Sequence, residues 1–228
     1  MTKYKSVIRS ICFAATSIAL LIFNPVSVNA HDFSVGLKSG IVLSRISSID
    51  KCYSYSQNEG YPKYAYPPGL YAALFGEVRF FKNISIISEL GFLKTTAKIT
   101  ITTSTESIPE KKYYGTYFRL PLIVKYQPAQ LFMPYFLCGV DVGYLIKARC
   151  KEMDLFDKRQ RSFEMTNDLQ TIDFSAIVGF GSVFKICNQS FLWEARLGLG
   201  LTKYTSLDGR FLKSWKNNVL MLAAGIVL

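Results

Sequence analysis

The chain has 228 residues, half of them hydrophobic and 14% aromatic, and a formal net charge of +11 at pH 7. Its positive charges form no basic run, which argues against nucleic-acid binding. Beyond the first 30 residues no apolar run reaches the 18 or so residues of a membrane-spanning helix, so a helical inner-membrane protein is excluded.

The first 30 residues have the composition of a secretory signal peptide. Three basic residues precede position 10, an apolar run of thirteen residues follows at 11–23, and Val28-Asn29-Ala30 forms a small-x-small cleavage motif. The run is too short for a spanning helix, so we expect export and cleavage before His31. The mature chain 31–228 then forms one domain with a charge of +8, the total of +11 less three leader cations.

Eight segments of the mature chain are predicted to be strands. Seven of them alternate apolar side chains with polar, charged or small ones, namely 33–46, 69–80, 84–102, 113–126, 131–146, 170–186 and 191–204. The eighth, 217–228, is apolar on both faces. In the third segment the apolar residues move from even to odd positions after Lys94. This change predicts either a β-bulge there or a strand that leaves the bilayer.

The segment 191–204 shows the alternation most clearly. Its odd positions are apolar from Phe191 to Leu201, whereas its even positions include Glu194, Arg196 and two glycines. Successive side chains of a strand point to opposite faces, and a strand crosses a bilayer in roughly 9–11 residues. We therefore interpret it as a membrane-spanning strand with lipid on the apolar face and the barrel interior on the other.

The connections between these segments alternate between long and short. Long connections are predicted at 47–68, 103–112, 147–169 and 205–216, and short ones at 81–83, 127–130 and 187–190. This alternation is typical of an up-and-down barrel with all short turns in the periplasm. Since unpaired edge amides are not tolerated in hydrocarbon, we expect the eighth strand to pair with the first. The predicted fold is thus an all-β, eight-stranded antiparallel transmembrane barrel.

Short motifs recur along the mature chain in a set order. They are Gly36-Leu37-Lys38-Ser39-Gly40, Ser88-Glu89-Leu90-Gly91-Phe92, Leu120-Pro121-Leu122, the stretch 135–143, Glu194-Ala195-Arg196-Leu197-Gly198-Leu199 and Asn217-Asn218. Together they resemble the PorT-type family of outer-membrane β-barrels. The resemblance implies the outer membrane of a Gram-negative bacterium and, from the family's namesake, a part in protein secretion.

Five cations and five acids fall on the predicted inward face. They are Lys38, Arg79, Arg119, Lys125 and Arg196, and Glu77, Glu89, Asp141, Asp173 and Glu194. The interior of an eight-stranded barrel has room only for side chains, and an unpaired buried charge is strongly unfavourable. An ion or proton pathway is one interpretation. The balanced signs and the narrow bore favour the other, a salt-bridge network that fills the barrel.

No catalytic, metal or cofactor site is expected. The only histidine is His31 at the mature N-terminus, so a Ser–His site within the barrel would lack its general base. No ligands stand in zinc-like spacing, and the Gly-x-Gly pairs have no strand-to-helix context for phosphate binding. We therefore expect a protein that is not an enzyme.

Tyrosines cluster in and beside the first long connection. Those considered for recognition are Tyr53, Tyr55, Tyr61, Tyr64 and Tyr66. Rigid tyrosines suit protein or glycan recognition, but an aromatic girdle at the membrane interface explains them equally simply and is favoured.

Two of the four mature cysteines fall in long connections on the same side. Cys52 and Cys150 could form a disulfide over the barrel mouth, since the exported compartment permits one. The alternative is that all four cysteines are free thiols.

Three functions remain open. The first is a non-enzymatic outer-membrane barrel with an envelope-structural role or a secretion- or assembly-type role through a protein partner. The second is a surface adhesin that acts through the tyrosine-rich loops. The third is a soluble, lipocalin-like barrel that binds an apolar ligand, which requires the apolar face to point inward. Outer-membrane lipid is the expected partner, and the positive charge favours anionic head groups.

Overall fold

The computed structural model describes residues 33–48, 62–101, 111–128, 134–153, 160–166, 169–202 and 215–228. The predicted signal peptide lies outside these residues. Among the residues described, no helix is long and apolar enough to cross a membrane.

The chain forms ten β-strands within this range. They are β1 (Phe33–Ser48), β2 (Pro62–Ala65), β3 (Pro68–Phe81), β4 (Ile84–Ile101), β5 (Lys111–Tyr126), β6 (Tyr135–Met153), β7 (Gln160–Glu164), β8 (Ile172–Ile186), β9 (Gln189–Gly200) and β10 (Trp215–Val227).

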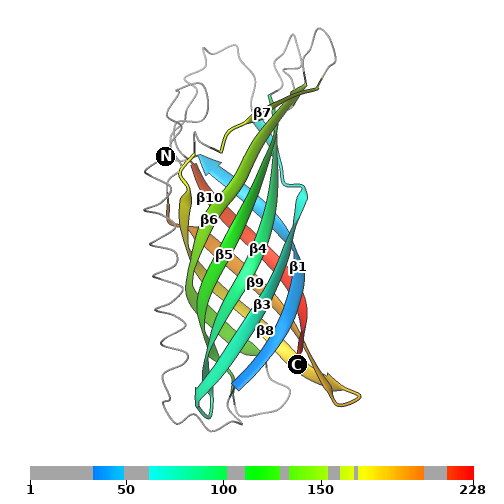
Figure 1. Cartoon of the computed structure of the whole chain (residues 1–228), viewed down its shortest axis with the longest axis vertical. Helices are drawn as coiled ribbons and strands as arrows, with labels where there is room; N and C mark the ends of the chain where they lie inside the picture. The colour runs from blue at the N-terminus through cyan, green and yellow to red at the C-terminus, as the bar shows by residue number, and fades with distance from the viewer. Residues whose placement is uncertain are drawn as a thin grey trace. The chain divides into compact units, whose positions relative to one another are not determined.

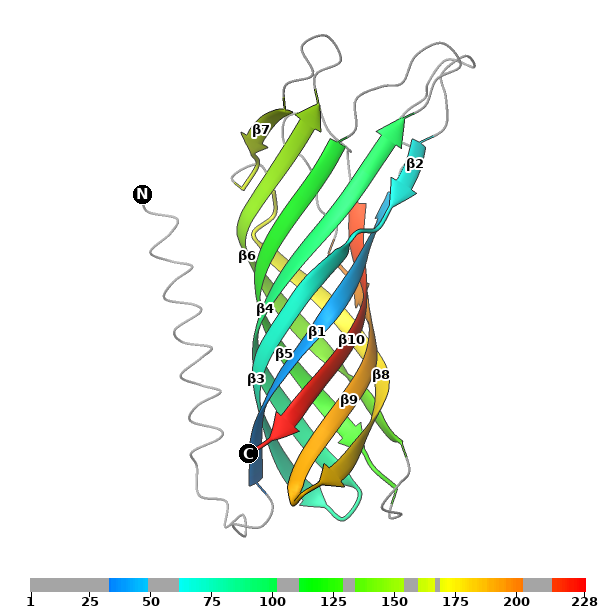
Figure 2. The ribbon, with the colours of Figure 1, turned by 90° about the vertical axis from the view of Figure 1, so that its right-hand side faces the viewer.

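Eight of these strands close into an antiparallel barrel. Around the barrel the order is β1, β3, β4, β5, β6, β8, β9 and β10, and β10 pairs with β1 from Gly36↔Val227 to Ser48↔Trp215. Figures 1 and 2 show the tilted strands from two sides. The predicted fold and its closure are confirmed.

A two-residue turn joins β8 to β9, where a short connection was predicted. Cys187 and Asn188 both have positive φ, 47° and 67°. Two residues of positive φ form the type I′ turn, whose twist matches that of the strands it connects.

Two predicted long connections contain more strand than the sequence indicated. In the connection predicted at 47–68, β2 pairs with the far end of β4. In the one predicted at 147–169, β6 continues to Met153 and β7 pairs with it. Polar residues alternate with apolar ones less regularly here, so the sequence indicated loops. Cross-strand pairing with β4 and β5, which the sequence does not display, holds these segments extended.

A β-bulge in β6 changes which side chains point inward. Thr116 is paired with Lys147 but Tyr117 with Leu145, so Ile146 is the extra residue. Ala148 and Cys150 are buried as a result.

No such shift occurs at Lys94, where a bulge was one of the two alternatives predicted from the sequence. The β4–β5 register is continuous there, and alternate residues from Ser85 to Ala97 stay buried. The bulge prediction is therefore wrong for β4. The outward face of β4 turns polar beyond Phe92, which is the last large apolar residue exposed on that face.

The barrel is apolar outside and mixed inside. Phe92, Val140 and Leu197 are 58%, 55% and 40% exposed, whereas Glu194 and Arg196, which alternate with Leu197, are 1% and 2% exposed. Such facing suits lipid outside the barrel. A soluble barrel that binds an apolar ligand needs the opposite facing, so this alternative is overturned.

Leu197→Arg should destabilise the folded barrel by about 2–4 kcal/mol, the cost of a lipid-facing cation near the bilayer midplane. The measurement is urea-induced unfolding in lipid vesicles, with Leu197→Ala as the control for lost side-chain volume. Equal stability of the arginine and alanine variants would contradict the facing.

Candidate functional site

The barrel interior holds nine of the ten charges predicted to face it. They form seven ion pairs among the described residues, and these pairs divide into three groups. Most join strands that are not neighbours in the barrel wall, so they cross the interior.

The central group contains two carboxylates and two cations. Glu89 of β4 lies 2.8 Å from Lys38 Nζ of β1 and 2.6 Å from Arg196 Nη2 of β9. Glu194 of β9 lies 3.0 Å from the same Lys38 nitrogen and 2.6 Å from Arg196. The four side chains are at most 2% exposed. Each charge therefore has two opposite charges as neighbours, which offsets the desolvation that burial costs.

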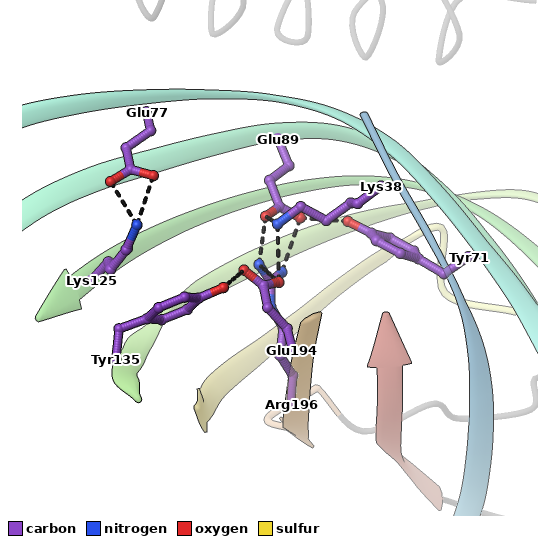
Figure 3. A network of polar contacts seen from close by, with 8 residues as sticks. All are labelled: Lys38, Tyr71, Glu77, Glu89, Lys125, Tyr135, Glu194 and Arg196. Carbon is purple, nitrogen blue, oxygen red and sulfur yellow. Dashed lines mark hydrogen bonds and ion pairs between the residues drawn. The ribbon is translucent and has the colours of Figure 1, made fainter. Parts of the chain in front are cut away.

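Two tyrosines complete this central group (Figure 3). The Tyr71 hydroxyl donates to Glu89 Oε2 at 2.6 Å, and the Tyr135 hydroxyl donates to Glu194 Oε1 at 2.9 Å. Arg196 donates to both oxygens of Glu89, at 2.9 and 2.6 Å. Such a bidentate pair fixes orientation as well as charge.

The second group centres on Arg119 of β5. Its Nη1 lies 3.0 Å from Asp141 Oδ2 and its Nη2 lies 3.1 Å from Asp173 Oδ2. The Ser175 hydroxyl lies between Arg119 and Asp141. Its Oγ accepts a hydrogen bond from Arg119 Nη1 and donates one to Asp141 Oδ2, both at 3.5 Å. One guanidinium thus bridges two carboxylates from β6 and β8.

The third group lies nearer the short turns. Lys125 Nζ lies 2.9 and 3.0 Å from the two oxygens of Glu77. Ser85 donates to the same carboxylate at 2.6 Å. The Lys125 ammonium also lies 4.6 Å from the centre of the Tyr135 ring, which lies against the central group as well.

Arg79 forms none of these ion pairs among the described residues, so its predicted place in the interior network is wrong, although it is paired with the buried Ser85 and keeps the inward parity. Its side chain is exposed, and it lies three residues before the turn at Lys82-Asn83. So close to the end of a strand, inward and outward side chains both reach the surface.

Four polar partners of the charged groups were not predicted to take part in the network: Tyr71, Tyr135, Ser85 and Ser175. The alternation itself could have identified the tyrosines, because Tyr71 lies between two predicted lipid-facing residues and Tyr135 next to another, Phe136. They were overlooked because tyrosines were considered as loop and girdle residues.

Apolar side chains pack on both sides of the charged groups. One cluster, which includes Phe75, Ile123 and Leu192, lies toward the short turns. The other, which includes Tyr117, Leu145 and Met221, lies toward the long connections. Along β5, for example, Arg119 stands between Tyr117 of one cluster and Ile123 of the other. A pocket at the long-connection end has a volume of about 60 Å³.

This interior offers little chemistry to a substrate. The carboxylates and cations pair with one another, and their side chains are at most 12% exposed. Over the described part of the chain, no three histidine, cysteine or acidic residues gather where a metal could be held. The arrangement can stabilise the barrel and block its bore.

Comparison with protein families identifies the barrel. A family model described as "Outer membrane protein beta-barrel domain" matches residues 23–206. The chain belongs to this family. The predicted outer-membrane location is thereby confirmed. As an outer-membrane β-barrel, it has short periplasmic turns and an extracellular end formed by the long connections.

No curated protein sequence matches the chain significantly. Among solved structures it is similar to Ail of Yersinia pestis in complex with the heparin analogue sucrose octasulfate, at 15% identity and a TM-score of 0.42, over 86% of this chain and 99% of that one. It is also similar to the outer membrane protein OprG of Pseudomonas aeruginosa, at 13% identity and a TM-score of 0.45, over 86% of this chain and 95% of that one. A third similar structure is Neisserial surface protein A, at 11% identity and a TM-score of 0.42, over 85% of this chain and 96% of that one.

The tyrosines considered for recognition fall mostly outside the described residues of this outer-membrane β-barrel. Tyr53, Tyr55 and Tyr61 lie there, whereas Tyr64 belongs to β2. Tyr66 follows β2 and is 36% exposed. Recognition through these tyrosines stays a prediction.

The predicted disulfide also stays a prediction, because Cys52 lies outside the described residues. Cys150 was predicted to lie in a long connection, and this prediction is wrong. It lies in β6, is 1% exposed and packs in the apolar cluster near Tyr117 and Met165. The bulge at Ile146 turns it inward.

Glu89→Gln should destabilise the barrel by about 3–5 kcal/mol, because it removes one partner of two buried cations. Glu77→Gln is the matched control, since its carboxylate is 12% exposed and water can reach the group left behind. Urea-induced unfolding in lipid vesicles measures both. The role of the central group would be contradicted if the Glu89 variant were no less stable than the Glu77 variant.

If Cys52 and Cys150 are bridged, denatured protein should take up an alkylating label at both positions only after reduction. Mass mapping identifies the labelled residues. Cys187, exposed in the periplasmic turn, should be labelled in either state and serves as the internal control. Labelling of both cysteines before reduction, in protein from oxidising membranes, would rule the bridge out.

Proposed function

We propose that the protein is a non-enzymatic outer-membrane barrel with an envelope-structural or partner-binding role. The observation that carries this proposal is the filled interior. A charged layer held by seven ion pairs lies between two apolar clusters, so the bore has no path for a solute.

The small pocket supports the same proposal. Its volume of about 60 Å³ is far below the roughly 300–1,000 Å³ of a small-molecule site. The function is therefore assigned to the outer surfaces and ends of the barrel and to the partners they contact. A secretion- or assembly-type role, as the PorT-type resemblance implies, fits a barrel that anchors a partner without conducting solutes.

The extracellular end offers a surface for such contacts. There β4, β5 and β6 continue beyond the apolar belt, with β2 paired to β4 and β7 to β6. A rigid sheet can present a partner with fixed side chains at a smaller entropic cost than loops can.

The purified protein should show no stable large conductance in planar lipid bilayers, because a filled eight-stranded interior leaves no aqueous channel. A porin reconstituted in the same way serves as the positive control. Steady porin-like current steps from the folded protein would contradict the proposal and favour an ion pathway through the charged groups.

The partner-binding part of the proposal is tested by crosslinking in intact cells. A photoreactive residue at Thr96, on the outward face beyond the apolar belt, should give a discrete protein adduct. The same residue at Leu197, which faces lipid, should give none. Identical adduct patterns from the two positions would contradict a partner at the extracellular sheet.

A further inference from the structure

The barrel closes along the pair formed by β1 and β10, which we call the seam (Figure 2). Every other neighbouring pair in the barrel wall joins wall strands that follow one another along the chain. In such pairs the turn or connection limits the register of the two strands. The seam has no connection of this kind, because β1 is the first strand of the barrel and β10 is the last. The register of the seam must therefore come from side chains.

The lipid-facing side of the seam does not specify a register. A slip of two residues keeps every side chain on its own face, so alternation does not exclude it. All but one of the outward side chains are apolar, and such a slip would bring apolar residues against apolar ones again. The outward cross-strand pairs are Leu37↔Ile226, Ser39↔Ala224, Ile41↔Leu222 and Leu43↔Leu220.

The inward side of the seam carries a single charge among the residues whose side chains are described, Lys38 of β1. Lys38 is paired with Gly225 of β10. A Cβ atom at Gly225 would lie 2.9 Å from the Lys38 Cβ atom, which is too close. The glycine thus leaves room for the lysine in this register, whereas a slip of two residues would place Ala223 or Val227 opposite it.

The central group joins the two sides of the seam (Figure 3). Lys38 and Glu89 belong to β1 and β4 on one side, and Glu194 and Arg196 belong to β9 on the other. Lys38 Nζ lies 3.0 Å from Glu194 Oε2, and Arg196 Nη2 lies 2.6 Å from Glu89 Oε1. Two ion pairs therefore cross from one side of the seam to the other.

A slip of the seam would separate these crossing ion pairs. A shift of two residues moves one strand about 6.8 Å along the other, since a strand rises about 3.4 Å per residue. An ion pair needs its nitrogen and oxygen within about 4 Å of each other. The four side chains are at most 2% exposed, and buried charges that lose their partners are strongly unfavourable. The observed register is the one in which both crossing pairs form.

We propose that the central group sets the register in which β1 closes on β10. Apolar packing along the seam stabilises several registers, whereas the ion pairs distinguish among them by leaving buried charges unpaired in the wrong ones. A buried polar residue fixes the alignment of coiled-coil helices in the same way. The stagger at closure is linked to the tilt of the strands and the size of the barrel. This role concerns the formation of the barrel and does not depend on the proposed partner-binding function.

The test traps the register of the seam as a disulfide in the full-length protein, folded in lipid vesicles and oxidised with copper phenanthroline. The pair Ser39→Cys/Ala224→Cys reports the observed register. The pairs Leu37→Cys/Ala224→Cys and Ile41→Cys/Ala224→Cys report slips of two residues in either direction. In the observed register these diagonal neighbours lie roughly 7–8 Å apart, beyond the roughly 7 Å that a disulfide can span. The natural cysteines are replaced by alanine throughout, and mass mapping identifies the crosslinks.

The test variant is Lys38→Met/Glu89→Gln/Glu194→Gln/Arg196→Met. It removes two cations and two acids, so no charge of the central group is left unpaired. Replacing a whole buried ionic group by uncharged residues of similar volume is often tolerated by the fold. Folding is checked by the heat-dependent gel mobility of the barrel. If the fourfold variant does not fold, Lys38→Met/Glu194→Gln takes its place, because it breaks one of the two crossing ion pairs.

The matched control is Lys125→Met/Glu77→Gln. It also removes a buried cation and a buried acid that form an ion pair, but this pair belongs to β5 and β3 and does not cross the seam. The control therefore separates a loss of interior charge in general from the loss of the crossing pairs.

In the unaltered background and in the control, crosslinking in the observed register should exceed that in either slipped register by roughly 100-fold, because a slip leaves buried charges unpaired. In the test variant this preference should fall by roughly 10-fold or more, since the remaining contacts of the seam fit several registers. An unchanged preference in the test variant would overturn the proposal. An equal fall in the control would also overturn it, because any loss of interior charge would then loosen the seam.

Discussion

The fold depends on one constraint: in hydrocarbon, every backbone amide needs a hydrogen-bond partner within the protein. Pairing of β10 with β1 meets this need by removing the last two open edges. Closure with eight strands then leaves an interior just wide enough for side chains. Each residue that points inward must therefore pack against others or pair its charge, and the ionic network is the consequence.

The network satisfies this requirement by sharing partners. Glu89 binds both Lys38 and Arg196, and Arg119 bridges two aspartates. Partners so far apart in the sequence fix the relative positions of opposite strands, with apolar clusters on either side. An interior filled in this way supports the proposal that the function of the protein resides on the outer surfaces of the barrel.

At the extracellular end the constraint no longer applies, since water can satisfy an open edge. There β2 and β7 pair with single neighbours, and β4 to β6 continue as a sheet whose outward face is basic.

The sequence by itself determined the barrel, its number of strands and the inward position of nine charged residues, because alternation with a period of two assigns every strand residue to a face. It placed Arg79 wrongly because alternation does not show where a strand reaches the surface. Only the tertiary structure decided which charges meet, since strand tilt and register bring Glu89 to Arg196 from 107 positions away. The inward position of Cys150 was likewise decided by the tertiary structure, because the bulge at Ile146, where β6 pairs with β5, reverses the alternation of the residues beyond it.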